Sequence, residues 1–246
     1  MAENDVNATQ TPIGSRIIGE GLNFAASEAY NLLRANIGLS FADKNTCKVI
    51  GVTSACPQEG KSLTTLNTAY AFAKSGKRVL LIDGDMRRPT VAKNLNLPLA
   101  PGLSNALTGD DVHIHAGVLH ENLCVLLSGD IPPTPSELIG SERMRTLLKE
   151  LSASFDYIFI DFPPITAVSD AITISDSVDG FVIVVRHGYT RKKTLIETLR
   201  QLELARARIV GLVYNGYSHK RGYYRSGKYY KSGYYHSNYY YSSKDN

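Results

Sequence analysis

Tryptophan is absent from this 246-residue sequence, and cysteine occurs only three times, as Cys47, Cys56 and Cys124. Three scattered cysteines are too few for a disulfide framework or a zinc site, so a reducing cytoplasm is the simplest expected location. No apolar run approaches about 18 residues, the length of a membrane span. Residues 1–14 also lack the apolar stretch of a signal peptide. We therefore expect a chain that neither crosses nor enters a membrane by itself.

Acidic residues are nearly missing from one end of the chain. Residues 217–246 contain six Lys or Arg and one acid, Asp245, whereas the whole chain has a formal net charge of +4. Residues 1–216 therefore have a net charge of −1, which gives no support to a general nucleic-acid-binding function. The same terminal segment holds ten of the 15 tyrosines.

Short runs rich in Val, Ile and Leu alternate with segments of helical spacing between residues 23 and 216. This alternation is typical of an α/β fold, with a mostly parallel sheet covered by helices on both faces. The predicted strands are 48–53, 78–82, 123–127, 157–160, 180–185 and 209–214, and the predicted helices are 24–41, 62–75, 136–152 and 190–205. In the first helix, the expected apolar stripe contains Leu32, Leu33, Ile37 and Phe41.

The composition divides the chain into three parts. Residues 1–22 are polar and are predicted to form a flexible lead, residues 23–216 form the folded domain, and residues 23–41 are its first helix. Residues 217–246 have almost no aliphatic side chains, so burial cannot offset the entropy of ordering them. We predict a disordered tyrosine-rich tail.

A phosphate-binding loop follows the first predicted strand. Residues 54–62 read SACPQEGKS and end like the motif G-x-x-x-x-G-K-[ST], although Ala55 replaces its first glycine. Backbone N–H groups at the start of the next helix would face phosphate, Lys61 would reach its oxygens, and the Ser62 hydroxyl suits Mg²⁺. An ordinary strand–turn–helix corner is the alternative, but the position between a strand and a helix favours the phosphate site.

Two later strands end in carboxylates. Asp83 and Asp85 follow one strand, and Asp161 follows another. The carboxyl ends of parallel strands meet at the ligand crevice of such sheets, so these acids are expected beside the phosphate loop. A single Asp at a strand end is usually a turn or helix-cap residue, but three together favour a chemical role.

This ordered set of motifs resembles the bacterial tyrosine kinases of capsule and exopolysaccharide operons. The resemblance covers nearly the whole chain. It includes the loop 57–62, the segment 82–87 that looks like the family's Walker A′ motif, residues 161–164 as Walker B, the stretch 132–138 and the tyrosine-rich tail.

The resemblance implies a P-loop NTPase-like fold that transfers phosphate from ATP, with Mg²⁺, to a tyrosine hydroxyl. Asp83 is by similarity the best candidate to accept or orient the tyrosyl proton, but the division of roles between Asp83 and Asp85 stays open. Arg87 and Arg88 would either steady phosphate or be solvated turn charges. The expected catalytic residues are Lys61, Asp83, Asp85 and Asp161, and the expected magnesium ligands are Ser62, Asp85 and Asp161. The expected ATP-binding residues are Pro57, Gln58, Glu59, Gly60, Lys61, Ser62, Leu63 and Asn215, the last as an adenine contact or a turn residue.

The tail offers many tyrosines as phosphate acceptors, joined to the domain by a basic segment. The expected acceptors are Tyr223, Tyr224, Tyr229, Tyr230, Tyr234, Tyr235, Tyr239, Tyr240 and Tyr241. By itself the tail also suits a stacking platform for single-stranded nucleic acid, an aggregation-prone tract or a carbohydrate-binding segment. Together with an ATP site, autophosphorylation is the preferred interpretation, and no nucleic-acid partner is expected.

Residues 28–34 resemble the family's E-x-x-R-x-x-R motif, through which subunits pack in a ring. Glu28 and Arg34 match it, while Asn31 replaces the first arginine, and a helix that merely covers the sheet edge is the alternative. The resemblance further implies a transmembrane polysaccharide chain-length regulator as activator. The chain would then be cytoplasmic, recruited to the inner face of the cell membrane, and would regulate capsular or exopolysaccharide synthesis and chain length.

The main competing interpretation is a ParA/MinD-like ATPase that acts as a nucleotide-dependent positioning switch. Such ATPases carry a signature lysine where this chain has Cys56, which argues against that mechanism. A third interpretation is a tethered RNA-binding protein, for which steep salt dependence of RNA affinity would be the evidence.

Overall fold

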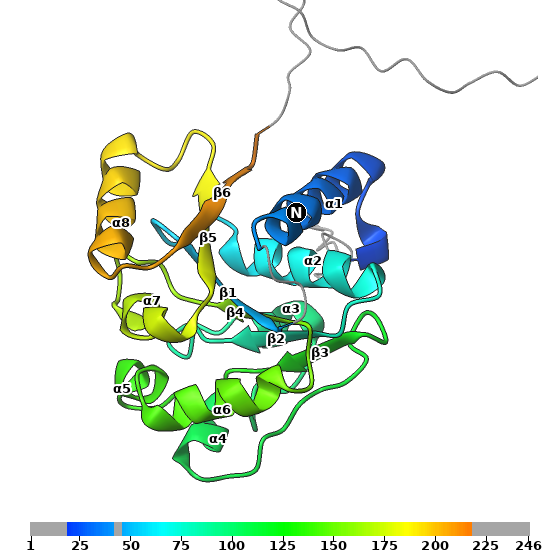
Figure 1. Cartoon of the computed structure of the whole chain (residues 1–246), viewed down its shortest axis with the longest axis vertical. Helices are drawn as coiled ribbons and strands as arrows, with labels where there is room; N and C mark the ends of the chain where they lie inside the picture. Colours follow the sequence, from blue (N-terminus) through cyan, green and yellow to red (C-terminus); the bar gives the residue numbers. More distant parts are fainter. Residues whose placement is uncertain (1–18, 42–45, 218–246) are drawn as a thin grey trace, which may run out of the picture.

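A single parallel sheet forms the centre of the structure, a computed structural model that describes residues 19–41 and 46–217. Within these residues the sheet has six strands in the order β3-β2-β4-β1-β5-β6 (Figure 1). The strands are β1 (Lys48–Ser54), β2 (Val79–Asp83), β3 (Leu123–Leu126), β4 (Tyr157–Asp161), β5 (Gly180–Arg186) and β6 (Ile209–Asn215). The predicted α/β class is confirmed, and all pairings between these strands are parallel.

Helices cover both faces of this sheet (Figure 1). Helices α1 (Phe24–Leu39), α2 (Lys61–Lys74) and α3 (Val91–Leu95) pack against one face. The other face is covered by α4 (Leu103–Thr108), α5 (Pro135–Ile139), α6 (Glu142–Ser152), α7 (Asp170–Thr173), the 3₁₀ turn η3 (Ser175–Ser177) and α8 (Lys192–Leu204).

Alternate residues of each strand supply the two cores. In β2, Val79 and Leu81 pack with α2, whereas Leu80 and Ile82 pack with α4 and α6. All four are fully buried. This explains the continuous apolar runs of the other five strands, because both of their faces are covered. The edge strand β6 is the exception, since Ile209, Leu212 and Tyr214 are exposed.

Two of the predicted helices differ in the structure. The segment 136–152 was expected to be one helix, but the chain turns at Gly140 and restarts as α6, where the Ser141 hydroxyl accepts a hydrogen bond from the Met144 amide. A capping hydroxyl competes with continuation of a helix, which accounts for the break. In α1, Leu32 is 62% exposed and does not belong to the buried stripe, while Ile37 and Phe41 are buried as expected.

The described residues extend a little beyond residues 23–216 at both ends. Within the predicted lead, Gly19–Gly21 form the 3₁₀ turn η2, and Gly19 is buried beside Tyr70. At the other end, the Tyr217 ring packs edge-on against His187, so the described fold includes the first residue assigned to the tail. The remainder of the lead and the tail, with all nine expected acceptor tyrosines, lie outside the described residues. Within the described ranges, no helix has the length and apolar character needed to span a membrane.

A close contact inside the sheet gives a first prediction. A Cβ atom at Gly51 in β1 would lie 2.4 Å from the Phe181 ring, and that ring is fully buried. We expect Gly51→Ala to lower the free energy of unfolding by about 1–3 kcal/mol, because the core has no room to relax. Gly38→Ala in α1 is the control, since nothing lies within 4 Å of its added Cβ. Urea unfolding of both variants checks this, and equal effects would contradict it.

Candidate nucleotide-binding and phosphoryl-transfer site

The loop between β1 and α2 has the backbone geometry of a phosphate cradle. Gly60 precedes the first residue of α2 with φ of 88°, and Gln58 also has a positive φ of 64°. A Cβ atom at Gly60 would lie 2.2 Å from the Asn215 amide nitrogen, so only glycine fits there. The amides that follow Gly60 are at the N-terminus of a 14-residue helix, where anions bind favourably.

A buried glutamate holds this loop in place. Glu59 is completely buried; its carboxylate accepts a hydrogen bond from the Cys56 amide (2.9 Å) and another from the Thr190 hydroxyl. The Glu59 carbonyl accepts a bond from the Asn215 side chain (2.9 Å). The Glu59 side chain therefore points into the protein, and its hydrogen bonds hold the loop in this conformation.

The ends of β5 and β6 complete this support. The Arg186 guanidinium donates to the Gln58 carbonyl at 2.9 Å, and Asn215 uses its amide oxygen to accept from the Gly216 N–H at 2.8 Å. Both polar atoms of the Asn215 amide therefore have partners in the protein. Sequence reasoning missed Arg186 and Thr190, which no local motif marks, since they reach the loop only through the order of the strands.

The expected acids meet at the carboxyl ends of β2 and β4. Asp83 and Asp161 are register partners on these neighbouring strands. The Lys61 ammonium group lies 3.0 Å from a carboxylate oxygen of Asp85 and 3.4 Å from one of Asp161. It also donates to the Ser62 hydroxyl at 3.3 Å. One cation thus contacts two carboxylates in a largely buried setting.

Burial and mutual repulsion change the acidity of these groups. Burial raises the pKa of Asp83 to about 8, and the nearby charge of Asp161 adds to the shift. Burial likewise raises the pKa of Asp161, against the opposing effect of Lys61. Burial alone would lower the pKa of Lys61, but the charges of Asp161 and Asp85 raise it above its ordinary value. Lys61 is therefore a permanent cation at physiological pH.

An open pocket of about 760 Å³ lies over this charged group. The expected site residues Pro57, Gln58, Gly60, Lys61, Ser62, Leu63 and Asp85 line it, together with Arg87, Arg88, Pro163 and Pro164. Four expected residues do not line it: Asp83 and Asp161 are fully buried beneath, and Glu59 and Asn215 support the loop. Asp85 is thus the carboxylate of the three that faces the pocket.

Arg87 is anchored from a third part of the chain. Its guanidinium donates to the Ser136 hydroxyl at 2.8 Å and lies 3.7 Å from a carboxylate oxygen of Asp170. Ser136 in turn donates to the other oxygen of Asp170, which is completely buried. Arg87 is therefore held at the pocket rim by an ion pair instead of being a solvated turn charge. The sequence stretch 132–138 contributes Ser136, while Asp170 was not singled out from the sequence.

The expected oligomerisation residues lie on α1, away from this pocket. Glu28 is exposed and accepts a hydrogen bond from Asn31 within the helix, at 3.0 Å. Arg34 lies six residues further along α1. Asn31, which replaces an arginine of the ring motif, is thus a neighbour of Glu28 in the same subunit.

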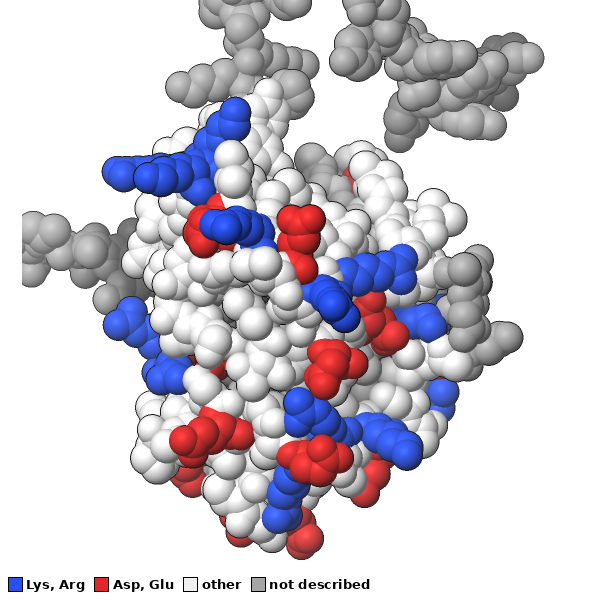
Figure 2. Space-filling view, turned by 60° about the vertical axis from the view of Figure 1, so that its left-hand side comes forward, with Lys and Arg blue, Asp and Glu red and all other residues white. Residues whose placement is uncertain are grey.

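Surface charge gives no sign of a nucleic-acid interface on the face seen in Figure 2. Basic and acidic side chains are interspersed there, with only a small group of basic side chains at the upper left. This mixture agrees with the near-neutral charge of residues 1–216, because a nucleic-acid surface normally gathers Lys and Arg on one face.

The parallel sheet, the loop at the start of α2 and the acids at the strand ends define a nucleotide-binding protein of the P-loop class. Comparison with protein families agrees, since a model described as "AAA domain" matches residues 47–209. Tyrosine-protein kinase YwqD of Bacillus subtilis is 38% identical over 204 residues, covering 80% of this chain and 86% of YwqD.

Two solved structures are also similar to this chain over most of its length. The kinase domain of the Escherichia coli tyrosine kinase ETK has a TM-score of 0.74 and 32% identity, over 85% of this chain and 80% of that one. The chimerical protein CapA2B2 has a TM-score of 0.74 and 33% identity, over 79% and 86% of the two chains. The chain belongs to the bacterial tyrosine kinase family, and it is a protein-tyrosine kinase.

A less similar solved structure shares the fold. The MinC:MinD cell division complex of Aquifex aeolicus has a TM-score of 0.57 and 24% identity, over 68% of each chain. This likeness concerns the fold alone. The kinase assignment, expected from the motifs, is confirmed by the more similar proteins.

The raised pKa values of the buried acids predict how stability depends on pH. An unfolded Asp ionises near pH 4, whereas folded Asp83 holds its proton to about pH 8. Between these values the folded state binds more protons, so the free energy of unfolding of the nucleotide-free protein falls as pH rises. We expect Asp83→Asn to reduce this slope between pH 5 and 8. Urea unfolding across that range measures it, and an unchanged slope would contradict the assignment.

Proposed function

We propose that this kinase uses ATP and Mg²⁺ to phosphorylate tyrosines within its own residues 223–241, between subunits. We propose further that it thereby regulates capsular or exopolysaccharide synthesis and chain length. One observation carries the catalytic part: Lys61, Ser62 and Asp85 line a single open pocket above the buried carboxylate of Asp161. Kinship with named tyrosine-protein kinases supports the acceptor chemistry.

The residues of the pocket fit a magnesium–phosphate group. Among the described residues, no three His, Cys, Asp or Glu side chains are arranged to hold a metal alone. Mg²⁺ prefers hard oxygen ligands and is commonly held by one or two carboxylates together with substrate phosphates. We assign Ser62, Asp85 and Asp161 to the metal. When bound, Mg²⁺ would neutralise charge on the phosphates of ATP during transfer.

Lys61 and the loop would hold the phosphates themselves. The backbone amides from Gly60 to Ser62 are at the N-terminus of α2, which is the positive end of its helix dipole. These three residues line the pocket. Lys61 contacts Asp85 and Asp161 in the structure, and its four-carbon stem lets the ammonium group turn from them toward phosphate oxygens. Pro57, Gln58 and Leu63 line the same wall.

Asp85 is our candidate for the residue that accepts the tyrosyl proton, through the carboxylate oxygen that does not bind the metal. It lines the pocket, whereas Asp83 is fully buried and its two oxygens accept bonds from the Asp85 and Val91 amides, each at 3.2 Å. Asp83 would then act as a positioning residue that fixes the loop carrying Asp85. The roles follow from access, because a proton acceptor must reach the incoming hydroxyl.

Arg87 and Arg88 stand at the rim where an acceptor chain would enter. Arg87 is oriented by Asp170, and Arg88 lines the pocket without an ion pair among the described contacts. We propose that both hold the tyrosine segment and the transferred phosphate, because one guanidinium group can donate two parallel hydrogen bonds to phosphate oxygens.

The nucleotide base would lie on the other side of the loop. A groove of about 600 Å³ runs between α1 and the end of β6, lined by Tyr30, Thr64, Asn215 and Gly216 among others. Thr64 lies in the first turn of α2, directly after the phosphate-binding residues. Asn215 keeps its proposed place beside adenine, and its bond to Glu59 would link base binding to the shape of the loop.

The tail tyrosines, the ring and the partner complete the proposal. Tyr223 to Tyr241 would enter the site of a neighbouring subunit in a ring formed through Glu28 and Arg34. A transmembrane polysaccharide chain-length regulator would activate the kinase and bring it from the cytoplasm to the inner face of the membrane. The solved CapA2B2 chimera, which is similar to this chain, supports looking for such a partner.

A ParA/MinD-like switch remains the second candidate, favoured only by the shared fold with MinD. Cys56 occupies the place of the signature lysine of such ATPases. An ATPase switch would hydrolyse ATP without phosphorylating itself, so the mass measurement below separates the two.

Loss of the Lys61 charge should stop autophosphorylation. The intact mass of the protein, expressed with ATP in the cell, should show a series of added phosphates that phosphatase removes and that map to residues 223–241. We expect Lys61→Met to lower this labelling at least about 100-fold, because the phosphates lose their main cation. Lys74→Met, at the exposed end of the same helix, is the matched control and should label normally.

Ser62→Ala covers the case in which Lys61→Met does not fold, since it removes a proposed metal ligand without unbalancing charge. The absence of any phosphate on the wild-type protein, even with an activating partner segment present, would favour the ATPase switch.

Charge exchange on α1 tests the ring. We expect Glu28→Arg and Arg34→Glu each to reduce the oligomeric mass and the tail labelling, because like charges would then face each other between subunits. The double variant should recover both, as the pair is restored with reversed sign. Light scattering measures the mass. Unchanged mass in both single variants would exclude this interface.

A further inference from the structure

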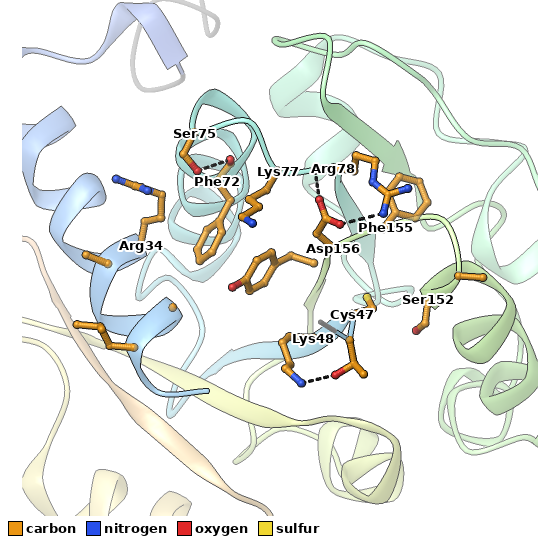
Figure 3. Close-up of a pocket in the computed structure, with 16 residues that line it drawn as sticks. Arg34, Cys47, Lys48, Phe72, Ser75, Lys77, Arg78, Ser152, Phe155 and Asp156 are labelled. Carbon is orange, nitrogen blue, oxygen red and sulfur yellow. Dashed lines mark hydrogen bonds and ion pairs between the residues drawn. The ribbon is translucent and has the colours of Figure 1, made fainter. Parts of the chain in front are cut away.

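A second pocket lies at the end of the sheet opposite the phosphate loop (Figure 3). It borders Lys48 and Tyr157, the first residues of β1 and β4, whereas the nucleotide site follows the last residues of these strands. Its volume is about 520 Å³, within the range of small-molecule sites. The ends of α1, α2 and α6 form its walls.

The pocket carries an excess of positive charge. Four cationic side chains and one acid line it: Arg34, Lys48, Lys77, Arg78 and Asp156. Arg78 engages both oxygens of Asp156, one through its guanidinium and one through its backbone N–H, each at 2.9 Å. This contact lowers the pKa of Asp156 below its ordinary value. Arg78 therefore satisfies the single acid, and the lining includes no second acid for Arg34 and Lys77.

Arg34 and Lys77 bring this charge from two different helical ends. Figure 3 shows Arg34 on α1 and Lys77 after α2, on separate walls of the pocket. The Arg34 Nε atom is buried and has no hydrogen-bond partner among the described residues. A buried donor without a partner is costly, and an anion in the pocket would satisfy it.

Aromatic rings accompany these cations. The Phe72 and Tyr157 rings pack against each other with centroids 4.3 Å apart, and Phe155 also lines the pocket. Burial raises the pKa of Tyr157, so its hydroxyl keeps its proton and can donate to an anion. Cations beside flat apolar rings suit a phosphate ester carried on an aromatic group.

We propose that this pocket binds phosphotyrosine from the tail segment 223–241. The inference rests on the proposed function, since autophosphorylation would generate the ligand. Lys77 and the Nε–H group of Arg34 would bind the phosphate, which leaves the terminal nitrogens of Arg34 for the proposed subunit contact. The Tyr157 ring, backed by the buried Phe72 ring, would pack against the phenyl ring. A clustered set of basic residues is a common way to recognise phosphorylated motifs.

The tail has the reach that this requires. Tyr241 follows Tyr217 by 24 residues, and an extended segment of that length spans at most about 80 Å. The strands that separate the two ends of the sheet have at most seven residues, or about 23 Å. Tyrosines late in the tail could therefore enter the pocket of their own subunit or of a neighbour.

Peptide binding tests the proposal without depending on catalysis. The full-length protein, treated with phosphatase and kept free of ATP, is titrated into a fluorescent peptide of residues 227–241 phosphorylated at Tyr234 and Tyr235, or into the unphosphorylated peptide. We expect the phosphorylated peptide to bind about tenfold or more tightly. Lys77→Glu should remove this preference. Lys74→Glu changes an exposed cation at the end of α2 that does not line the pocket, so it should keep the preference.

Competition distinguishes the sources of phosphate. Phenyl phosphate should displace the peptide more effectively than inorganic phosphate or AMP at equal concentration. Equal affinity for the two peptides, equal loss in the Lys74 and Lys77 variants, or preferred displacement by AMP would overturn the proposal. Because the peptide is phosphorylated by synthesis, these outcomes stand apart from the mass measurement, which alone decides whether the chain labels itself.

Discussion

The ammonium group of Lys61 balances carboxylates that the sheet topology forces together. Asp83 and Asp161 are register partners on β2 and β4, and Asp85 follows two residues after Asp83. Lys61 contacts Asp161 and Asp85 from the first turn of α2. Without this cation, the carboxylates of Asp85 and Asp161 would repel each other in a buried setting, where charges are poorly screened. The same arrangement suits a magnesium–phosphate site. Mg²⁺ can replace Lys61 as the cation beside the carboxylates, and phosphate oxygens can replace the carboxylates as partners of Lys61.

The rest of the site keeps this group in position. Glu59 fixes the phosphate loop from inside, with partners from the ends of β5 and β6. Asp170 and Ser136 fix Arg87 at the opposite rim. Buried carboxylates therefore act in two ways here: some carry the proposed chemistry, and others hold the loops that carry it. These two roles account for the acidic residues around a pocket that we propose binds the phosphates of a nucleotide.

Short contiguous sequence patterns predicted much of this structure. Contacts that depend on the order of the strands could not be predicted from such patterns. The apolar strands, the loop ending at Ser62 and the strand-end acids were visible because each is a short contiguous signal. The support of the loop by Thr190 and Arg186 was not, because it joins residues about 130 apart through strand order. The break before α6 was missed because the Ser141 cap lies within an otherwise helical pattern, and Leu32 was misplaced because α1 buries a narrower stripe than its composition suggests. The different accessibility of Asp83 and Asp85 likewise depends on the fold, since the two carboxylates are equivalent in the motif.

The central claim is that Lys61, Asp85 and Asp161 form one site for a magnesium-bound nucleotide. Calorimetric titration of a non-hydrolysable ATP analogue, with and without Mg²⁺, tests it most directly. The account predicts that Mg²⁺ raises the affinity of the wild-type protein by about tenfold or more, and that Asp161→Asn abolishes this gain while analogue binding in the absence of Mg²⁺ is retained. Affinity that is independent of Mg²⁺, or a gain that persists in Asp161→Asn, would contradict it.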